Sequence, residues 1–479
     1  MSQPGPVLSG VARATITPPV GIRMMGYTVQ PCASERVERD LTATALVLGD
    51  GQQRVVVLAC DLLFVQAPHA DRLREAIGSR LGLAPRHVLI HCSHTHLGPM
   101  LPGWDDPPPE EARRQQRYLD HLEELLCGAA AQAAACMQPA RLAVIEGRVA
   151  LGINRRERLP DGRVVIGENP HGAVDHTLGV VRIDRLDGRP LAVVMIAACH
   201  PVVLGPRSNC ISPDFVGPAR ELVEQASGAT ALFLQGAAAN VNPVCGIGQG
   251  GPEQFEDQVR LGTMLAGETL RCWAQLNTHR RRGAREIVQS VAPISTWRYE
   301  PMPQAGTPAL AVREEVRLLP LGELPSLADA EKQRQQYQAA YDEAVAAGQP
   351  LGAQRVAARL ARWAGIVRDA AAAGVRPVTR PLHVWALRIN DLALVAVNGE
   401  PFAELGLEVR ARSPLPHTFL LGYSNGCLGY FPTPEAFSEG GMEVVESYRN
   451  YCLPAPFTPQ WGPAIVTTAL ALLQGLARA

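Results

Sequence analysis

Residues 91–99 read His91-Cys92-Ser93-His94-Thr95-His96-Leu97-Gly98-Pro99 and bring three imidazoles to the end of an apolar run, residues 86–90, that is typical of a buried strand. His94 and His96 stand two residues apart, and in an extended segment two such side chains point to the same face. A His-x-His pair at a strand exit is suited to a metal ion, or to a metal and its substrate. A short histidine cluster is about as often a structural or surface feature, so the metal interpretation requires partners elsewhere in the chain.

The same arrangement, an apolar strand that ends in a polar side chain, returns twice along the chain. Residues 190–198 lead into Cys199-His200-Pro201, and residues 392–397 lead into Asn398-Gly399-Glu400. In α/β proteins the loops at strand ends commonly hold the ligand. His200 and Glu400 are therefore candidate partners of the first histidine cluster.

The alternation of strands and helices favours an α/β fold, which we expect to have a mixed β-sheet core flanked by helices, and the length of the chain fits one large or two closely packed domains. Expected strands cover residues 7–17, 41–48, 53–60, 86–90, 175–183, 190–198, 231–234, 383–389, 392–397 and 418–423, and expected helices include 68–81, 118–137 and 252–276. Residues 326–374 are rich in Ala, Arg, Gln and Glu with helical periodicity, interrupted at Gly348-Gln349-Pro350. This segment is expected to be an inserted helical hairpin, an accessory element or lid and not a catalytic centre.

The composition argues against a nucleic-acid-binding, membrane-spanning or disulfide-rich protein. The chain has 45 Lys and Arg against 46 Asp and Glu, which gives no basic footprint for nucleic acid or for an anionic membrane. No apolar run approaches the ~20 residues of a membrane span, and the first residues lack the pattern of a signal peptide. The eleven cysteines are odd in number and form no Cys-x-x-Cys pair, so a disulfide framework and a structural zinc knuckle are not expected. We expect a cytoplasmic protein that is not stably inserted in a membrane.

Seven motifs in order give the chain a resemblance to a known family. They are His94-Thr95-His96-Leu97-Gly98-Pro99, Asn154-Arg155, Cys199-His200-Pro201, Ser212-Pro213-Asp214-Phe215, the small-residue loop 235–243, Gly399-Glu400-Pro401-Phe402 and the segment 422–432. Together they resemble the catalytic domain of the neutral (alkaline, non-lysosomal) ceramidases, from about Gly10 to Tyr451, and the resemblance implies a single domain over residues 1–479 with the hairpin of residues 326–374 inserted in it. The immunoglobulin-like C-terminal domain of the full-length enzymes is not expected in this chain.

The resemblance implies a zinc amidase whose Zn2+ is held by His94, His200, Glu400 and Tyr430. It assigns His96 to proton transfer or oxyanion contact and Arg155 to anchoring a polar or carboxylate group of the substrate, beside a catalytic contribution of Tyr430. Without the resemblance, the adjacent arginines 155 and 156 are typical of a solvated surface, and the loop 235–243 fits tight helix packing as well as close approach to a ligand.

Two departures from the family pattern bear on the substrate. Asn242 stands where the ceramidases carry a catalytic serine, and Met442 precedes Glu443 where the family often has Tyr-Glu. The amide of Asn242 is not a nucleophile but can donate a hydrogen bond, so Asn242 is assigned to substrate contact. Asn240 and Met442 are assigned to substrate contact as well.

The resulting hypothesis is a zinc-dependent hydrolase of a C–N amide bond in a small soluble N-acyl compound or lactam. One alternative is an amide-forming, condensing or cyclising enzyme on the same metal site. Another is a metal-binding or ligand-binding homologue that has lost catalysis. The partner is expected to be a small-molecule amide, and the sequence predicts no particular oligomeric state.

Overall fold

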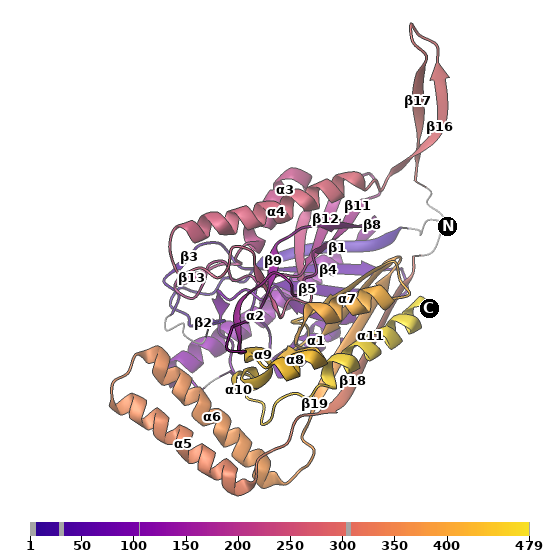
Figure 1. The fold of residues 1–479 in the computed structure, drawn as a ribbon. Coiled ribbons are helices and arrows are strands. Elements are labelled where there is room, and N and C mark those ends of the chain that lie inside the picture. The colour runs from indigo at the N-terminus through magenta and orange to yellow at the C-terminus, as the bar shows by residue number, and fades with distance from the viewer. Residues whose placement is uncertain (1–5, 28–32, 105, 303–307, 479) are drawn as a thin grey trace.

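The molecule is built from two β-sheets that pack face to face, with helices on both outer surfaces (Figure 1). The computed structural model describes residues 6–27, 33–104, 106–302 and 308–478. Most of the N-terminal stretch from which the absence of a signal peptide is inferred, residues 1–5, lies outside the described residues. None of the helices in the described part of the chain is long and apolar enough to cross a membrane.

The larger sheet has eight strands in the order β14-β12-β11-β8-β1-β4-β5-β6. Their bounds are β14 (Thr230–Gln235), β12 (Pro190–Ala197), β11 (Thr177–Arg185), β8 (Gln138–Arg148), β1 (Val7–Thr15), β4 (Thr42–Gly49), β5 (Arg54–Cys60) and β6 (Val88–Cys92). The β12–β14 and β5–β6 pairs, one at each edge, are parallel and the other pairs are antiparallel. The sheet is therefore mixed.

The smaller sheet has four strands in the order β18-β19-β20-β22. They are β18 (Leu310–Pro320), β19 (Thr379–Ile389), β20 (Leu392–Val397) and β22 (His417–Leu421), with β20 and β22 parallel. Alternate residues of these strands face the larger sheet. Trp385 and Leu387 of β19 share one buried cluster with Leu46 and Leu48 of β4.

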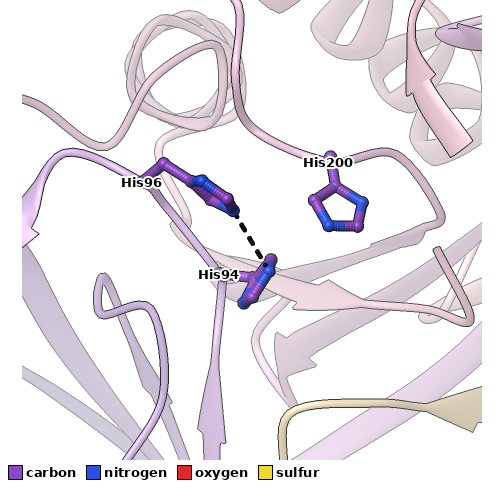
Figure 2. Close-up of side chains that lie close together, drawn as sticks. All are labelled: His94, His96 and His200. Carbon is purple, nitrogen blue, oxygen red and sulfur yellow. Dashed lines mark hydrogen bonds between the residues drawn. The ribbon is translucent and has the colours of Figure 1, made fainter. Parts of the chain in front are cut away.

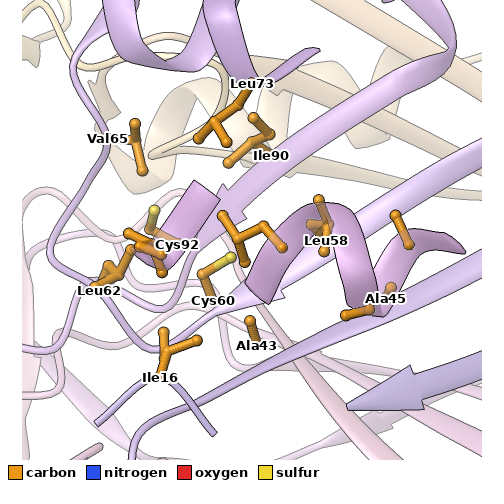
Figure 3. Packing of buried hydrophobic residues seen from close by; sticks show 14 of the residues in the cluster. Ile16, Ala43, Ala45, Leu58, Cys60, Leu62, Val65, Leu73, Ile90 and Cys92 are labelled. Atoms are coloured by element: carbon orange, nitrogen blue, oxygen red, sulfur yellow. The ribbon is translucent and has the colours of Figure 1, made fainter. Parts of the chain in front are cut away.

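The outer faces of both sheets are covered by helices. Helices α1 (Ala67–Leu81) and α2 (Pro109–Ala135) cover one half of the larger sheet, and Figure 3 shows how their side of the sheet is filled. Helices α3 (Val216–Ser227) and α4 (Glu253–Gln275) cover the other half, while α7 (Ala403–Arg412) and α11 (Trp461–Ala477) cover the smaller sheet. Since both faces of each sheet are buried, the central strands are near-continuous apolar runs.

The two edge strands of the larger sheet approach each other at their carboxyl ends. His91 Nε2 accepts a hydrogen bond from the backbone N–H of Gln235 at 2.7 Å, which joins β6 to β14. An isolated bridge links His91 to Ser424, just after β22, and another links Gly236 to Leu421. The ends of β6, β14 and β22 therefore converge, although they belong to opposite edges and to different sheets.

The helical hairpin lies between β18 and β19 and consists of α5 (Leu327–Ala346) and α6 (Leu351–Ala373). Ser326 caps α5 by accepting a hydrogen bond from the backbone N–H of Asp329, and Gly374 ends α6 in the left-handed conformation. Trp363 of α6 is buried, and its indole N–H donates to the carbonyl of Leu453 at 2.8 Å. The expected α/β fold with an inserted helical hairpin is thus observed.

A second excursion, the β-arm of residues 280–302, was not predicted. Its strands β16 (Arg280–Val288) and β17 (Ile294–Pro301) form a separate two-stranded sheet that projects far from the body (Figure 1). The remaining short elements are β2 (Met24–Met25), β3 (Arg36–Val37), β7 (Gly98–Pro99), β9 (Gly152–Arg158), β10 (Val164–Asn169), β13 (Cys210–Ile211), β15 (Val241–Pro243), β21 (Glu400–Pro401), β23 (Tyr430–Phe431), α8 (Pro434–Glu439), α9 (Met442–Val445), α10 (Ser447–Asn450) and a 3-10 turn over Pro85–His87.

Packing between the sheets predicts a large stability effect at Trp385. The side chain is 1% exposed and its indole N–H donates to the carbonyl of Arg86 at 2.7 Å. Trp385→Ala leaves a cavity and an unpaired carbonyl, so we expect a loss of about 3–5 kcal/mol in the free energy of unfolding, measured by urea titration. Leu318→Ala is the matched control, because Leu318 is 69% exposed on β18. Equal losses for the two variants would contradict this packing.

Candidate functional site

A cavity of about 490 Å³ opens where the strand ends converge. Its lining includes three histidines, two glutamates, three tyrosines and several arginines. The members considered below are His94, His96, His200, Glu400, Tyr430, Tyr27, Tyr451, Arg155, Asn242, Met442, Arg23, Arg355, Arg359, Glu446 and Arg449. The three separate strand-end motifs of the sequence therefore meet in one cavity.

His94 is fixed in position by the chain that leaves β6. Its backbone N–H donates to the carbonyl of Leu62 at 2.9 Å, and its backbone is in the left-handed region with φ of 67°. The imidazole stacks on the ring of Tyr423 at 4.0 Å, and Nδ1 lies 2.9 Å from the carbonyl of Leu63. Such a conformation is costly for a residue other than glycine and occurs where the surroundings hold it, often at functional sites.

His200 follows β12 and is held in the same way. Its Nδ1 lies 2.8 Å from the carbonyl of Ala238, and its backbone N–H donates to the carbonyl of Val241 at 3.1 Å. A ring nitrogen that faces a carbonyl carries the proton. His94 and His200 therefore both present the lone pair of Nε2 to the cavity.

Glu400 supplies a carboxylate between these two nitrogens. It is fully buried, and the hydroxyl of Tyr451 donates to its Oε1. Oε2 lies 3.4 Å from His94 Nε2 and 3.6 Å from His200 Nε2, and within the described residues it has no hydrogen-bond partner. Three acceptors thus face one another in a buried space, which is unfavourable unless a cation lies among them.

The spacing of these donors fits a metal ion. Metal–ligand bonds of about 2.0–2.2 Å in a tetrahedral site place neighbouring donor atoms about 3.3–3.6 Å apart. The two distances from Glu400 Oε2 fall in this range. Ligand nitrogens of His94, His96 and His200 all lie within 4.8 Å of one another (Figure 2). The residues present therefore fit a metal ion, which His94, His200 and Glu400 would hold.

Burial keeps the three imidazoles neutral, as metal ligands must be. It lowers the pKa of His94, His96 and His200 well below 6.5. The positive charge of Arg155 lowers the pKa of His96 and His200 further. In contrast to these rings, His91 lies outside the cavity, between Gln235 and Ser424, and has a structural role.

His96 reaches the cluster by a different route from the one expected. His94 and His96 lie in an irregular segment after β6 and not in an extended strand, so the two-residue spacing does not by itself bring them together. Their Nε2 atoms nevertheless lie 3.2 Å apart (Figure 2), because the left-handed backbone at His94 redirects its ring. Tyr27 packs against the other side of His96, with ring centroids 4.9 Å apart.

Tyr430 stands next to Glu400 through a two-residue parallel pairing. Strand β21 pairs with β23 so that Glu400 and Tyr430 are direct partners. Burial raises the pKa of the Tyr430 phenol above its usual value, and the charge of Glu400 raises it further. The phenol lines the cavity and is available as an additional oxygen ligand or as a proton donor.

Arg155 is buried, which corrects the surface interpretation of the two adjacent arginines. Its Nε donates to Glu443 Oε1 at 2.9 Å, and its Nη1 lies 3.4 Å from both His200 Nε2 and Asn242 Oδ1. Arg156 is also buried and donates to the other carboxylate oxygen of Glu443 at 2.9 Å. Glu443 therefore orients both guanidinium groups.

The residues assigned to substrate contact divide into two groups. Asn242 and Met442 line the cavity. Asn240 is fully buried, and its amide oxygen accepts from the backbone N–H of Ala403 while its nitrogen donates to Glu404 at 2.8 Å. Its side chain is thus occupied at the start of α7 and is not part of the cavity lining.

Several residues of the site were not identified from the sequence. Glu443 and Tyr451 act on Arg155 and Glu400, which are far away in the chain, so no local spacing marks them. The hairpin also contributes, because Arg355, Val356, Arg359 and Leu360 of α6 line the cavity. The insertion therefore forms part of the wall of the site.

Comparison with known families identifies the family of this chain. A family model for the neutral/alkaline non-lysosomal ceramidase, N-terminal region, matches residues 8–249. The chain belongs to this ceramidase family. Membership implies a hydrolase that acts on amides, in a family whose members depend on a metal.

Solved ceramidase structures match the full fold. The neutral ceramidase from Pseudomonas aeruginosa aligns over 99% of this chain and 75% of that chain, with 16% identity and a TM-score of 0.66. A ceramidase complexed with C2 aligns over 98% of this chain and 76% of that one, with 16% identity and a TM-score of 0.68. At this identity the likeness shows the fold alone, and it confirms the expected fold class, while the family model confirms the expected family.

The arrangement of His94, His200 and Glu400 in this chain predicts how its metal content responds to substitution. Purified protein is expected to contain near-stoichiometric metal by elemental mass spectrometry. His200→Ala and Glu400→Ala should each lose most of it, because each removes one donor from the set. His171→Ala is the control, since His171 is exposed. A metal-free wild type, or metal that persists in both variants, would show that the site is not a metal centre.

Proposed function

We propose that this chain is a zinc-dependent amidase that hydrolyses a C–N amide bond of a small soluble N-acyl compound or lactam. The observation that carries the proposal is the buried Glu400 Oε2, which lacks a hydrogen-bond partner within the described residues and faces two imidazole lone pairs. Two neutral imidazoles and one carboxylate are a common ligand set of catalytic zinc. His94, His200 and Glu400 would hold the ion, with Tyr430 beside them.

Bound zinc supplies a Lewis acid that polarises the amide carbonyl and makes a water molecule acidic. The side chains of the cavity provide the remaining functions. Arg155 places a fixed positive charge beside His200, where negative charge on a tetrahedral oxygen can be stabilised. His96 is a neutral imidazole whose Nε2 lies 3.2 Å from that of His94, and it can accept or deliver a proton. Asn242 accepts from Arg155 through its oxygen, so its amide N–H groups remain to donate to the substrate.

The size of the cavity supports a small-molecule substrate, and its lining is both apolar and polar. Its volume of about 490 Å³ lies within the range of small-molecule sites, roughly 300–1,000 Å³. Arg23, Arg355, Arg359, Arg449 and Glu446 also line it, and Arg23 and Arg355 pair with Glu111 at 3.5 and 3.7 Å. Arg155 lies beside His200, where its guanidinium can contact a polar or carboxylate group of the substrate, which favours a compound such as an N-acyl amino acid.

We also propose that the enzyme acts in the cytoplasm. Of the ten cysteines in the described residues, five are buried thiols that form no disulfide, namely Cys60, Cys92, Cys199, Cys210 and Cys272. Free thiols in this number are typical of proteins kept in a reducing compartment.

A panel of N-acyl amino acids, N-acyl amines and lactams tests the activity. Release of free amine or ring opening is expected from at least one class, and His200→Ala and Glu400→Ala should abolish it in parallel with metal content. His171→Ala should leave it unchanged. Bound metal without turnover across the panel would support a binding homologue, and product formation only from free acid and amine would support an amide-forming enzyme.

Because Arg155 contacts His200, substitution of Arg155 is expected to lower kcat/KM without changing the metal content. Arg155→Lys keeps a positive charge but cannot contact Glu443 and the reacting group in the same planar geometry. We expect kcat/KM to fall about 10²–10³-fold, the usual cost of one oxyanion donor, while metal content stays at the wild-type level. Arg163→Lys is the control, because Arg163 is exposed. A wild-type rate in Arg155→Lys would exclude Arg155 from catalysis.

A further inference from the structure

The β-arm of residues 280–302 contacts solvent on both faces. Every residue of β16 and β17 is exposed except the half-buried Gly283. Large apolar side chains are concentrated on it. Ile287, Val288, Val291, Ile294, Trp297 and Tyr299 all have exposed fractions between 43% and 109%. An isolated two-stranded ribbon is at best marginally stable in water, so a ribbon with this many exposed apolar groups needs a partner surface.

The two faces of the β-arm differ in charge. On one face, Arg281 pairs with Glu300 at 3.0 Å and Arg298 pairs with Glu286 at 2.7 Å. These ion pairs neutralise that face.

The opposite face is an uncompensated ladder of cations and aromatic rings. The register places Arg282 opposite Tyr299 and Arg285 opposite Trp297, with a bulge between them. The guanidinium of Arg280 lies over the Tyr299 ring at 4.7 Å, and that of Arg282 lies over the Trp297 ring at 5.3 Å. None of these three arginines has a carboxylate partner among the described residues. Arginine and aromatic side chains are the residue types most enriched at protein interfaces.

Charge decides between the possible partners. The β-arm holds five arginines and two glutamates, a net charge of +3 in a chain of net charge −1, so the rest of the chain carries −4. Pairing of one arm with another would bring like charges together. Contact with the body of another molecule would bring opposite charges together. The body has acidic surface, including a hollow of about 510 Å³ lined by Glu404, Glu408, Glu435 and Glu439. Arg156 pairs with Glu439 and Arg412 with Glu408 in this hollow, which leaves Glu404 and Glu435 without an ion pair among the described residues.

We propose that the β-arm docks on the body of a second copy of this chain, with the Arg280, Arg282, Arg285, Trp297 and Tyr299 face inward. Two arms exchanged in this way form a closed dimer that buries Ile287, Trp297 and Tyr299 of both arms. The β-arm contributes no residue to the cavity lining, so this inference is independent of the proposed amidase activity.

Sedimentation velocity over a wide range of protein concentration tests the proposal. The wild type is expected to sediment as a dimer or a larger closed assembly. A variant in which a short glycine turn replaces residues 281–300 should sediment as a monomer with unchanged metal content. The triple variant Arg280→Glu/Arg282→Glu/Arg285→Glu should weaken association at least about tenfold, because it reverses the charge of the docking face.

The matched control is Arg281→Ala/Glu300→Ala, which removes one ion pair from the opposite face and leaves the net charge unchanged. It should associate like the wild type. A monomeric wild type, or association that survives removal of the β-arm, would overturn the proposal. So would a monomeric wild type that pellets with phosphatidylglycerol vesicles only when the β-arm is present, since the partner would then be a lipid surface.

Discussion

Mutual repulsion among three buried acceptors is the constraint on which the site depends. Glu400 Oε2 lies 3.4 Å from His94 Nε2 and 3.6 Å from His200 Nε2, and the opposite atom of each group is anchored by Leu63, Ala238 or Tyr451. Anchoring prevents the side chains from turning away to relieve the repulsion. The fold therefore keeps these buried acceptor atoms close together, an arrangement that a bound cation would stabilise. Burial also opposes protonation of the imidazoles and so lowers their pKa values.

The layered architecture makes this arrangement rigid. The donors come from the ends of β6, β12 and β20, which belong to two different sheets, and the sheets are joined by one shared buried cluster that includes Trp385 and Phe419. A shift of one sheet over the other would separate Glu400 from the two histidines. Close packing between the sheets, which resists such shifts, thus sets the donor spacing. Glu443 has a similar positioning role, because its carboxylate holds the guanidinium of Arg155 beside His200.

The sequence predicted the parts of the structure in which composition and position agree. Strands β4, β5, β12 and β20 were located within one or two residues, since burial on both faces makes them apolar runs. The β-arm was missed because its strands follow no apolar alternation, and α11 because it lies beyond the last motif. For the site, the strand-end pattern indicated His200 and Glu400, and the family resemblance supplied the role of Tyr430. Glu443 and Tyr451 could not be found, since their partners are set by tertiary packing alone.

The position of the helical hairpin has a consequence for how this scaffold can diversify. Helices α5 and α6 leave and re-enter the protein between β18 and β19, two adjacent antiparallel strands, yet Arg355 and Arg359 reach the same cavity as the metal donors. The α6 residues that line the cavity and the strand ends that carry the donor atoms are therefore encoded by separable segments of the gene. Exchanging the hairpin at this junction would change the lining of the cavity and leave the strand ends in place, which makes residues 326–374 a natural unit for recombination and for redesign.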